Sequence, residues 1–469
     1  MENIERENIQ GMLLYGYKWL PVARYLFLSI TDVDKARSWI KQVDWRYATS
    51  SPRDQCMNIA FTAQGLKALG VPVDEENGFS RAFIEGMDTE HRNRILGDFG
   101  ANASTDWEWG NKQHDQLHLV LMVFTRDQAA LDNWDAVQSA TLAGAGLETC
   151  SDPIDSIRLP DGKEHFGFKD GISQPVIRGL GRQSSEDNYV NAGEFILGYE
   201  NDYGKEPHSP RIQKGEMDFG KNGSYMVFRQ LEQHVPLFWN TVCDHFGGKN
   251  EGREKGIELA AKMVGRWLNG NPLTEAPDKK IKSGDMNRFS FFLDDPNGTQ
   301  CPLGSHIRRS NPRDSLSSNS KSSSLRSATD AANKHRILRR GRPYGKPVDE
   351  GMAIDQILDK IDGDQESRGL NFICFNTDID RQFEFVQQTW SNNIKFHNLY
   401  NDVDPIMGVQ NGGRDEAGHY QMAPTQFEVQ ASPVRKRYQD VPPFVKVRGG
   451  SYFFLPGRQA LEYLSKSPD

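Results

Sequence analysis

Apolar runs and helix-like patterns alternate over the first third of the chain. Three apolar runs have the length of buried strands, at residues 24–30, 56–61 and 117–125. Each is followed by a segment with apolar residues at helical spacing, at residues 34–43, 62–69 and 127–142. Gly70 predicts where the second of these helices ends. The repeated order of strand and helix is typical of an α+β fold.

A similar pattern returns later in the chain. Strands are predicted at residues 225–230 and 369–376, and helices at residues 256–268 and 380–390. The stretch between the two patterns, residues 202–223, is rich in Gly, Pro, Lys and Asp, which favours a connection. The sequence therefore predicts two related α+β halves, residues 1–210 and residues 211–469.

A serine-rich insert occupies residues 315–329. It has too few apolar side chains to pack in a core, which predicts a mobile surface loop. The insert lies between His306 and Arg339, two candidate functional residues, and is not expected to alter the segment around either.

Composition narrows the class of protein. The net charge of −8 argues against a general nucleic-acid binder. No apolar run reaches the roughly 18 residues of a membrane span, and the polar N-terminus lacks the features of a secretory signal. The five cysteines are scattered without CxxC spacing, which predicts reduced thiols rather than a zinc site or a disulfide framework. We expect a cytoplasmic protein that binds neither nucleic acid nor membrane.

His306 is the first candidate functional residue. It follows a Pro- and Gly-containing break at residues 301–304 and precedes Arg308 and Arg309. One imidazole nitrogen can bind a metal ion, while nearby arginines suit anionic groups on the same ligand. Haem combines both needs, because its iron takes an axial histidine and its propionates attract arginine. A lone histidine is more often an ordinary surface or core residue, so this interpretation depends on other segments.

Asp170 lies in a second candidate segment, residues 164–175. Gly167 and Gly171 bracket the sequence Phe-Lys-Asp. Glycines allow tight turns and the close approach of a flat ligand. A carboxylate in an aromatic setting is a candidate general acid–base group, with a plain Asp-Gly turn as the alternative.

Arg339 and the strand at residues 369–376 supply further candidates. Ile337 and Leu338 precede Arg339 and predict a buried strand. A guanidinium there could stabilise a peroxide anion, although a basic turn that contacts phosphate explains the segment equally well. Leu370 and Phe372 share one face of their strand and could wall a pocket above a porphyrin, with core packing as the alternative.

Together these segments resemble the dye-decolorizing peroxidases, a family of haem enzymes. Residues 167–171, Gly-Phe-Lys-Asp-Gly, match the family's GxxDG motif. The segment around His306 is similar to that of the family's proximal ligand, and the segment around Arg339 to that of its distal arginine. The resemblance begins at residues 8–11 and ends at residues 447–456, almost the whole chain. It is strongest to the larger, intracellular branch of the family.

The resemblance implies a fold, a cofactor and an activity. The fold is a pair of ferredoxin-like halves, each an antiparallel sheet flanked by helices, with haem b in the C-terminal half. The activity is the reduction of H2O2 and the oxidation of dyes, phenols or other one-electron donors through a ferryl intermediate. His306 is implied as the proximal iron ligand, Asp170 as the group that moves a proton, and Arg339 as support for the charge when the O–O bond breaks. An acidic optimum is expected for dye oxidation.

Two supporting roles complete the expected site. Arg309, three residues after His306, is the expected partner of a haem propionate. A carboxylate should accept the second ring N–H of His306, and Asp404 is the first choice, with Asp378 and Asp380 as alternatives.

Several questions stay open at the level of sequence. Bulky donors should not enter the pocket, so Tyr344 and Trp390 are candidate surface aromatics that relay electrons, with packing as the alternative. The reductant is open among dyes, phenols, Mn(II) and small metabolites, and so is the oligomeric state.

Two other functions compete with the peroxidase interpretation. One is a protein that stores, delivers or strips haem iron, which would not need both Asp170 and Arg339. The other is a metal-free α/β protein with a phosphate site at Arg339.

Overall fold

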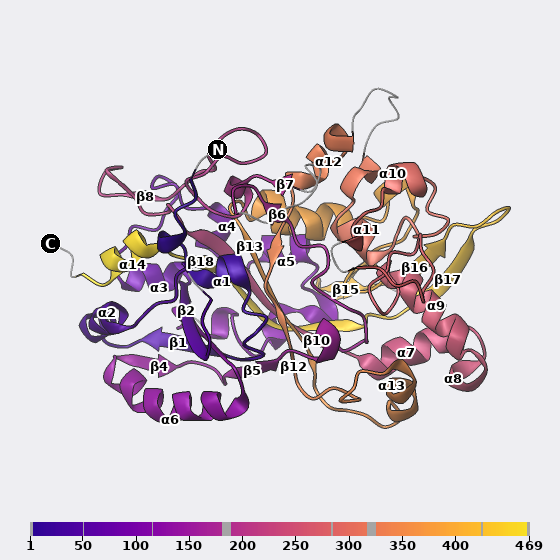
Figure 1. Cartoon of the computed structure of the whole chain (residues 1–469), viewed down its shortest axis with the longest axis horizontal. Coiled ribbons are helices and arrows are strands. Elements are labelled where there is room, and N and C mark those ends of the chain that lie inside the picture. The colour runs from indigo at the N-terminus through magenta and orange to yellow at the C-terminus, as the bar shows by residue number, and fades with distance from the viewer. Residues whose placement is uncertain are drawn as a thin grey trace.

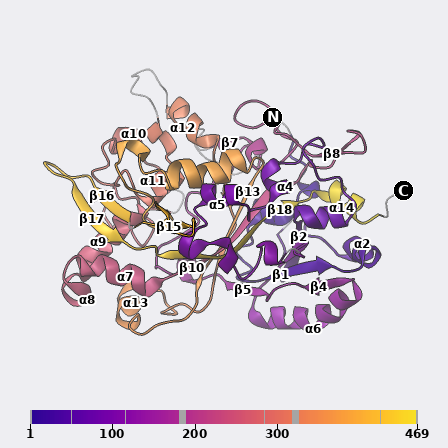
Figure 2. The ribbon, with the colours of Figure 1, turned by 180° about the vertical axis from the view of Figure 1, so that it is seen from behind.

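A ten-stranded antiparallel sheet runs through the molecule, with helices on its faces (Figure 1). The computed structural model describes residues 3–49, 51–114, 116–180, 189–282, 285–316, 325–423 and 425–466. The strand order is β11-β13-β10-β18-β2-β3-β1-β4, with β12 also paired to β13 and β5 to β1. Figure 1 places the N-terminal strands at the left and most of the C-terminal half at the right, and Figure 2 shows the same division from behind.

The N-terminal part of the sheet has the ferredoxin-like order β4-β1-β3-β2, with helices after its first and third strands. Side chains cap the helices of this part: Asp32 accepts a hydrogen bond from the Lys35 amide, and Asp127 accepts one from the Ala130 amide. The six predicted elements are all present. The elements of this part are β1 (Val22–Ile30), α2 (Val33–Gln42), β2 (Gln55–Phe61), α3 (Ala63–Ala68), β3 (Leu119–Thr125), α6 (Gln128–Gly144), β4 (Leu147–Thr149) and β5 (Ile154–Ile157).

The C-terminal part repeats this arrangement, with the order β11-β13-β10-β18. The fold class predicted from the resemblance, α+β with two ferredoxin-like halves, is therefore confirmed. The elements of this part are β10 (Ser224–Gln233), α7 (Val235–Asp244), α8 (Gly248–Glu251), α9 (Arg253–Val264), β11 (Leu338–Arg339), β12 (Arg342–Tyr344), β13 (Gly369–Asn376), η10 (Asp380–Glu384), η11 (Val386–Ser391) and β18 (Val445–Leu455).

Strands β2 and β18 join the two parts of the sheet where Phe61 pairs with Phe454. Helix α14 (Arg458–Leu464) then crosses back to pack beside α2, so the C-terminal segment lies on the N-terminal half (Figure 1). The two halves are thus held together by a shared sheet and by a returning helix.

The alternation of side chains along the strands creates two cores, one on each face of the sheet. In β3, Leu119, Leu121 and Val123 belong to one cluster, whereas Val120, Met122 and Phe124 belong to the other. Every residue of β3 is buried, which explains why its sequence is a continuous apolar run.

Two predicted segments differ from the structure. The helix predicted at residues 256–268 ends at Val264, because Gly265 adopts a left-handed conformation with φ +96°. Of the serine-rich insert, residues 317–324 lie outside the described residues, and Leu325–Asn333 form helix α12. The prediction of a loop up to residue 329 is therefore wrong over its last five residues. The helix predicted at residues 380–390 is present, with π-type hydrogen bonding in η10 and η11.

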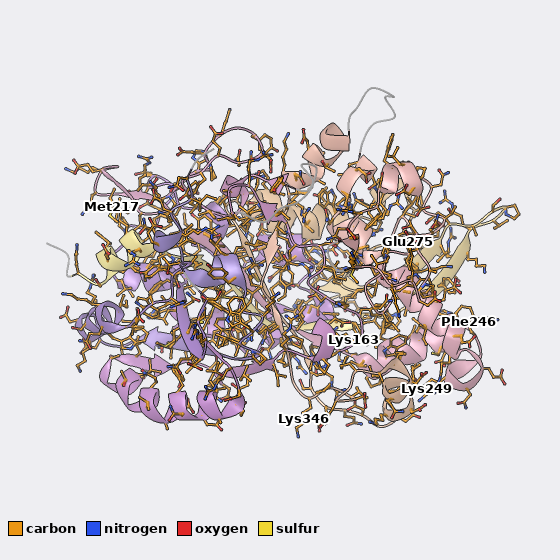
Figure 3. All side chains as sticks on the ribbon, in the orientation of Figure 1. Lys163, Met217, Phe246, Lys249, Glu275 and Lys346 are labelled. Atoms are coloured by element: carbon orange, nitrogen blue, oxygen red, sulfur yellow. The ribbon has the colours of Figure 1, made fainter. Side chains whose placement is uncertain are left out.

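Shorter elements surround the sheet, and Figure 3 shows the side chains that fill the space between them. No helix in the described ranges combines the length and the apolarity that crossing a membrane requires. These elements are α1 (Gly11–Tyr15), α4 (Arg81–Glu85), α5 (Glu90–Leu96), α10 (Phe291–Asp294), α11 (His306–Ser310), α13 (Ile354–Lys360), β6 (Val176–Ile177), β7 (Tyr189–Val190), β8 (Arg211–Ile212), β9 (Met217–Asp218), β14 (Asn411–Arg414), β15 (Tyr420–Met422), β16 (Thr425–Val429) and β17 (Lys436–Val441).

Candidate active site

A cavity of about 250 Å³ collects five of the predicted site residues. Asp170, His306, Arg339, Leu370 and Phe372 all line it, although they come from four separate segments of the chain. Strand β13 presents Leu370 and Phe372 on the same face, as its period of two predicts. The predicted residues therefore form one site rather than scattered packing positions.

His306 begins helix α11 and is oriented by a buried carboxylate. Its Nδ1 lies 2.9 Å from Oδ2 of Asp404, whose side chain is completely buried. Asp404 also accepts hydrogen bonds from the Ile406 and Met407 amides, at 2.9 and 3.1 Å. Since Nδ1 is engaged and the ring is 29% exposed toward the cavity, Nε2 is the nitrogen available to a ligand.

His306 and Asp404 shift each other's pKa values in opposite directions. Burial alone lowers the pKa of His306, but the Asp404 carboxylate outweighs burial, so that the pKa is raised. Burial alone raises the pKa of Asp404, but His306 and the two amides outweigh it in the other direction. The competing candidates are engaged elsewhere, Asp378 with Arg381 and Asp380 with Arg92.

Asp170 and Arg339 form an ion pair in the same cavity, with Nη1 of Arg339 2.8 Å from Oδ1 of Asp170. Burial alone raises the pKa of Asp170, but the Arg339 guanidinium outweighs burial, and the pKa is lowered. Arg339 is the last residue of strand β11, which confirms the predicted strand. Gly167 and Gly171 both have positive φ, +96° and +75°, so the turns around Asp170 need glycine.

Arg309 does not face the cavity, and the prediction that it contacts a propionate is wrong. Its fully buried guanidinium donates to backbone carbonyls, including those of Gly304, Trp390 and Asp402. Because the Arg309 guanidinium is hydrogen-bonded to these carbonyls, it holds the backbone around α11 and η11 in place.

Arg313 and Arg336 line the cavity instead, and the sequence interpretation missed both in this role. Arg313 donates to the Asn287 and Phe289 carbonyls, and Arg336 to the Ser173 carbonyl. Burial, with the charges of Arg313 and Arg339, lowers the pKa of Arg336 to about 9. The sequence did contain one indication of this role: Arg313 is the last residue of the segment 301–313, which also contains His306.

Glu164 was also missed as a site residue. It lines the cavity, and its carboxylate accepts hydrogen bonds from the Phe166 and Phe168 amides, both at 2.9 Å, and from Gln233. These bonds fix the turn that leads to Asp170. Burial raises the pKa of Glu164 to about 7.

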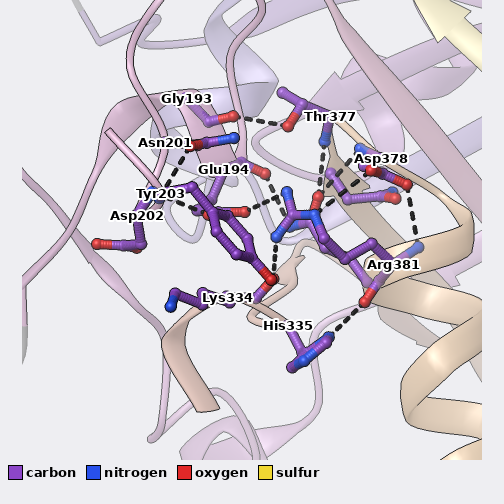
Figure 4. Close-up of polar contacts among 12 residues, drawn as sticks. Gly193, Glu194, Asn201, Asp202, Tyr203, Lys334, His335, Thr377, Asp378 and Arg381 are labelled. Atoms are coloured by element: carbon purple, nitrogen blue, oxygen red, sulfur yellow. Dashed lines mark hydrogen bonds and ion pairs between the residues drawn. The ribbon is translucent and has the colours of Figure 1, made fainter. Parts of the chain in front are cut away.

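A polar network around Arg381 fixes the segment that supplies another wall of the cavity. Arg381 lies between Glu194 and Asp378, with Nη2 2.7 Å from Glu194 and Nε 3.3 Å from Asp378, and the ring of Tyr203 lies beside it (Figure 4). Arg381 belongs to η10, and the following η11 carries Val386 to the cavity.

Tyr344 and Trp390 are both buried, with exposed fractions of 7% and 5%. The expectation that they are surface aromatics is therefore wrong. Whether either relays electrons stays a prediction.

Comparison with known proteins assigns the family. The profile for the DyP dimeric alpha+beta barrel domain matches residues 8–145, and that for the Dyp-type peroxidase C-terminal domain matches residues 191–402. The chain is 29% identical to a dye-decolorizing peroxidase of Exidia glandulosa, over 98% of this chain and 87% of that protein. It is also 29% identical to the multifunctional dye peroxidase DyP2 of an Amycolatopsis species, over 97% of this chain and 92% of that protein.

Solved structures agree. A decolorizing peroxidase from Auricularia auricula-judae superimposes with a TM-score of 0.78 at 25% identity, covering 99% of this chain and 100% of that one. A dye-decolorizing peroxidase in complex with 2,6-dimethoxyphenol superimposes equally well, at the same identity and coverage. The fold and the site define a peroxidase. The chain belongs to the dye-decolorizing peroxidase family, whose members depend on haem.

The lining of the cavity fits that cofactor. Apolar side chains such as Leu370, Phe372 and Val386 suit the flat face of a porphyrin, and one imidazole nitrogen is available for its iron. Arg313 and Arg336 are cations that form no ion pair with any described carboxylate, and they suit two propionates.

Proposed function

We propose that this protein binds haem b through His306, reduces H2O2 and oxidises dyes, phenols or other organic one-electron donors. The observation that carries the proposal is a single cavity that contains both the His306–Asp404 pair and the Asp170–Arg339 ion pair. A haem carrier would need the first pair but not the second. The similarity to dye-decolorizing peroxidases over almost the whole chain supports the same function.

His306, Asp404, Arg313 and Arg336 would hold the cofactor. Nε2 of His306 would ligate the iron, and Asp404 would give the imidazole anionic character by accepting its Nδ1–H. Arg313 and Arg336 would pair with the propionates. Bound haem would supply the site where peroxide binds and the electrons that reduce it.

Asp170 would act as the proton carrier. Its lowered pKa keeps the carboxylate ionised in mild acid, so it can accept a proton from the near oxygen of H2O2 and return it to the far oxygen. Arg339 would stabilise the negative charge on the departing oxygen. Over one cycle, H2O2 takes two protons and two electrons to give two waters, and two donor molecules each lose one electron. The ionised Asp170 is consistent with an acidic optimum for dye oxidation.

Substitution of Asp170 tests this function. Asp170→Asn should lower the rate of reaction with peroxide by about 10²- to 10⁴-fold, because the proton carrier is lost. Stopped-flow measurement of the Soret band would report the rate, and haem content should stay that of the unsubstituted protein.

The matched control is Asp161→Asn, an exposed acid in the same loop. It should react at the original rate. A haem-loaded protein that ignores peroxide would indicate a haem carrier, and protein without a Soret band after expression with ample haem would favour the phosphate-binding alternative.

The boundary between the halves and the compartment are also proposals. We propose that residues 1–210 and 211–469 form the two halves, which is supported by β10 starting the second set of strands at Ser224. A cytoplasmic location is supported by the five cysteines, which are all free.

A further inference from the structure

Arg336 and Arg339 reach the cavity from a short strand at the edge of the sheet. Strand β11 contains only Leu338 and Arg339, which pair with Phe375 and Cys374 of β13. Two paired residues fix a register weakly, and a slip by one residue would turn Arg339 to the other face of the sheet. The segment before β11 therefore needs another contact to hold it in place.

Gln382 supplies a bond where the ladder of β11 and β13 ends. The Arg340 amide donates to the Ile373 carbonyl at 2.7 Å, and hydrogen-bonded pairs occur at every second position of an antiparallel ladder. The same register sets Arg336 opposite Thr377, two such pairs further on. Nε2 of Gln382 donates to the Arg336 carbonyl at 2.6 Å, and Oε1 accepts from the Thr377 amide at 3.1 Å. The side chain thus bridges two backbone groups that a longer ladder would join directly.

Every hydrogen-bonding group of the Gln382 side chain is in use. Nε2 also donates to the Glu194 carbonyl at 2.9 Å, and Oε1 also accepts from the Asp378 amide at 3.0 Å. A side-chain amide has two N–H donors and two acceptor lone pairs, so these four bonds saturate it. Because the side chain is fully buried, loss of the amide would remove several buried hydrogen bonds at once.

Arg381, the neighbour of Gln382 in η10, holds two further residues of the same segment. Its guanidinium donates to the Lys334 carbonyl. Nδ1 of His335 lies 2.5 Å from the Arg381 carbonyl, a contact that Figure 4 marks with a dashed line. Three consecutive residues before β11 are therefore held by two consecutive residues of η10.

Both cavity arginines depend on where this segment lies. The Arg336 guanidinium donates to the Ser173 carbonyl at 2.9 Å, and the Arg339 amide donates to Oε1 of Gln174 at 3.1 Å. The side chain of Arg339 then reaches Asp170. A displaced backbone at residue 336 would therefore move a cation of the cavity wall and loosen the contact with the loop that carries Asp170.

We propose that Gln382 is a positioning residue, whose bridge holds the backbone at Arg336 and thereby sets the Arg336 guanidinium beside a haem propionate. Gln382 does not line the cavity, so it acts only through the segment that it holds. The part that concerns haem rests on the proposed function, whereas the effect on the backbone does not.

Gln382→Met tests the bridge, because methionine keeps the length of the side chain but has no amide. The matched control is Gln10→Met. Gln10 is also fully buried and does not line the cavity. Its amide likewise makes four hydrogen bonds, with the Ile59 backbone, the Pro456 carbonyl and the Asn58 side chain. The two variants therefore lose the same kind of buried contact in different places.

Transfer of haem from the loaded protein to an excess of apomyoglobin measures how firmly haem is held. Arg336→Ala should release haem about tenfold faster than the unsubstituted protein, because a cation facing a propionate is lost. Gln382→Met should release it about three- to tenfold faster, because the same cation is misplaced. Gln10→Met should stay within about twofold of the unsubstituted protein.

The double variant Arg336→Ala/Gln382→Met separates a role through Arg336 from a general loss of stability. It should release haem within about twofold of the rate of Arg336→Ala, since the guanidinium that Gln382 positions is already gone. Multiplied effects of the two substitutions would overturn the proposal. Release from Gln382→Met at the unsubstituted rate, or equally fast release from Gln10→Met, would also overturn it.

Gln382→Glu adds a dependence on pH and replaces the methionine variant if that variant does not fold. The ionised carboxylate would have no proton to donate to the Arg336 carbonyl, whereas the protonated carboxyl can donate one. The ratio of its haem-release rate to that of the unsubstituted protein should fall between about pH 8 and about pH 5, because a buried carboxyl takes up a proton readily. Neighbouring acids such as Glu194 and Asp378 are present in both proteins and cancel in the ratio. A ratio that stays equally high in acid would overturn the proposal.

Hydrogen exchange tests the backbone without haem. Amides of residues 336–340 should exchange faster in Gln382→Met than in Gln10→Met, because the end of the ladder opens more easily. If the protein took up no haem, the proposed function would fail, but this comparison would still decide whether Gln382 holds the segment. Equal exchange in the two variants would show that it does not.

Discussion

At the scale of single residues, the site depends on where each buried polar group finds its partner. His306 finds Asp404, and Asp170 finds Arg339, so each functional side chain has a partner that sets its charge. Arg309 shows the converse, since its guanidinium is fully buried, donates to backbone carbonyls and does not line the cavity.

Arg309 and Arg313 should respond differently to substitution by alanine. Arg309→Ala leaves several buried carbonyls unpaired and should cost about 2–4 kcal/mol of unfolding free energy. Arg313→Ala should instead weaken haem binding by about tenfold, because a cation facing the propionates is lost. Urea denaturation and haem titration measure the two effects. Weaker haem binding in Arg309→Ala with unchanged stability would contradict the assignment.

His165 should make stability depend on pH in acid. It is almost fully buried, its Nε2 lies 2.8 Å from the Tyr344 carbonyl, and burial lowers its pKa to about 4. The unfolded chain takes up this proton near pH 6.5. Between these values the unfolded state holds more protons, so stability falls as pH drops from about 6.5 to about 4, by at most about 1.4 kcal/mol per pH unit.

Substitution of His165 by glutamine should flatten that slope. Denaturation midpoints of both proteins at several pH values would show it. His118→Gln should flatten the slope as well, because burial also lowers the pKa of His118. Parallel pH curves for the unsubstituted protein and His165→Gln would remove His165 as the cause.

At the scale of elements, the ends of helices position the site more than their interiors do. Helix α9 is capped by Gly265 at its C-terminal end. Helix α11, which begins with His306, packs against α9. A Cβ at Gly265 would lie 2.5 Å from Cγ1 of Ile307 and 3.0 Å from Oγ of Ser305. The glycine therefore allows the close contact between the two helices.

Gly265→Ala should disturb the site as well as the fold. The left-handed backbone alone costs about 1–2 kcal/mol, and the overlap with Ile307 should add to it by moving α11. Gly247→Ala is the matched control, because Gly247 has nearly the same left-handed backbone (φ 94°, ψ 18°), while a Cβ there would meet only the flexible side chain of Glu251, at 3.2 Å. Denaturation should show a larger loss for Gly265→Ala, and its haem affinity should fall. Equal losses in the two variants would mean that the contact with Ile307 does not matter.

At the scale of the whole molecule, the two halves should unfold together. They share one sheet, and α14 of the C-terminal segment packs against α2 of the N-terminal half. Leu461 belongs to the same buried cluster as Trp39. Loss of this contact should therefore lower the stability of both halves, because they share one sheet and one buried cluster.

Leu461→Ala should lower the unfolding free energy by about 2–4 kcal/mol in a single transition. Tryptophan fluorescence and Soret absorbance should report the same midpoint, because the halves are coupled. Gln459→Ala, an exposed position on the same helix, should leave the midpoint unchanged. Separate midpoints for the two signals would show that the halves unfold independently.

The sequence by itself predicted the long strands β1, β2, β3, β10 and β13 and the helices that follow the first three of them. The strands are long apolar runs, and the period of two placed Leu370 and Phe372 on one face, because these patterns are local properties of the backbone. His306, Asp170 and Arg339 were singled out because their segments resemble motifs of the dye-decolorizing peroxidases.

Only the tertiary structure decided which side chains meet. The roles of Arg309 and Arg313, the carboxylate beside His306 and the early end of α9 depend on contacts between segments far apart in the chain. Helix α9 illustrates the reason: its apolar pattern continues to Leu268, yet the backbone at Gly265 turns away to admit Ile307. Spacing along a chain fixes which face a side chain takes, whereas its partner is fixed by the packing of the other elements around that face.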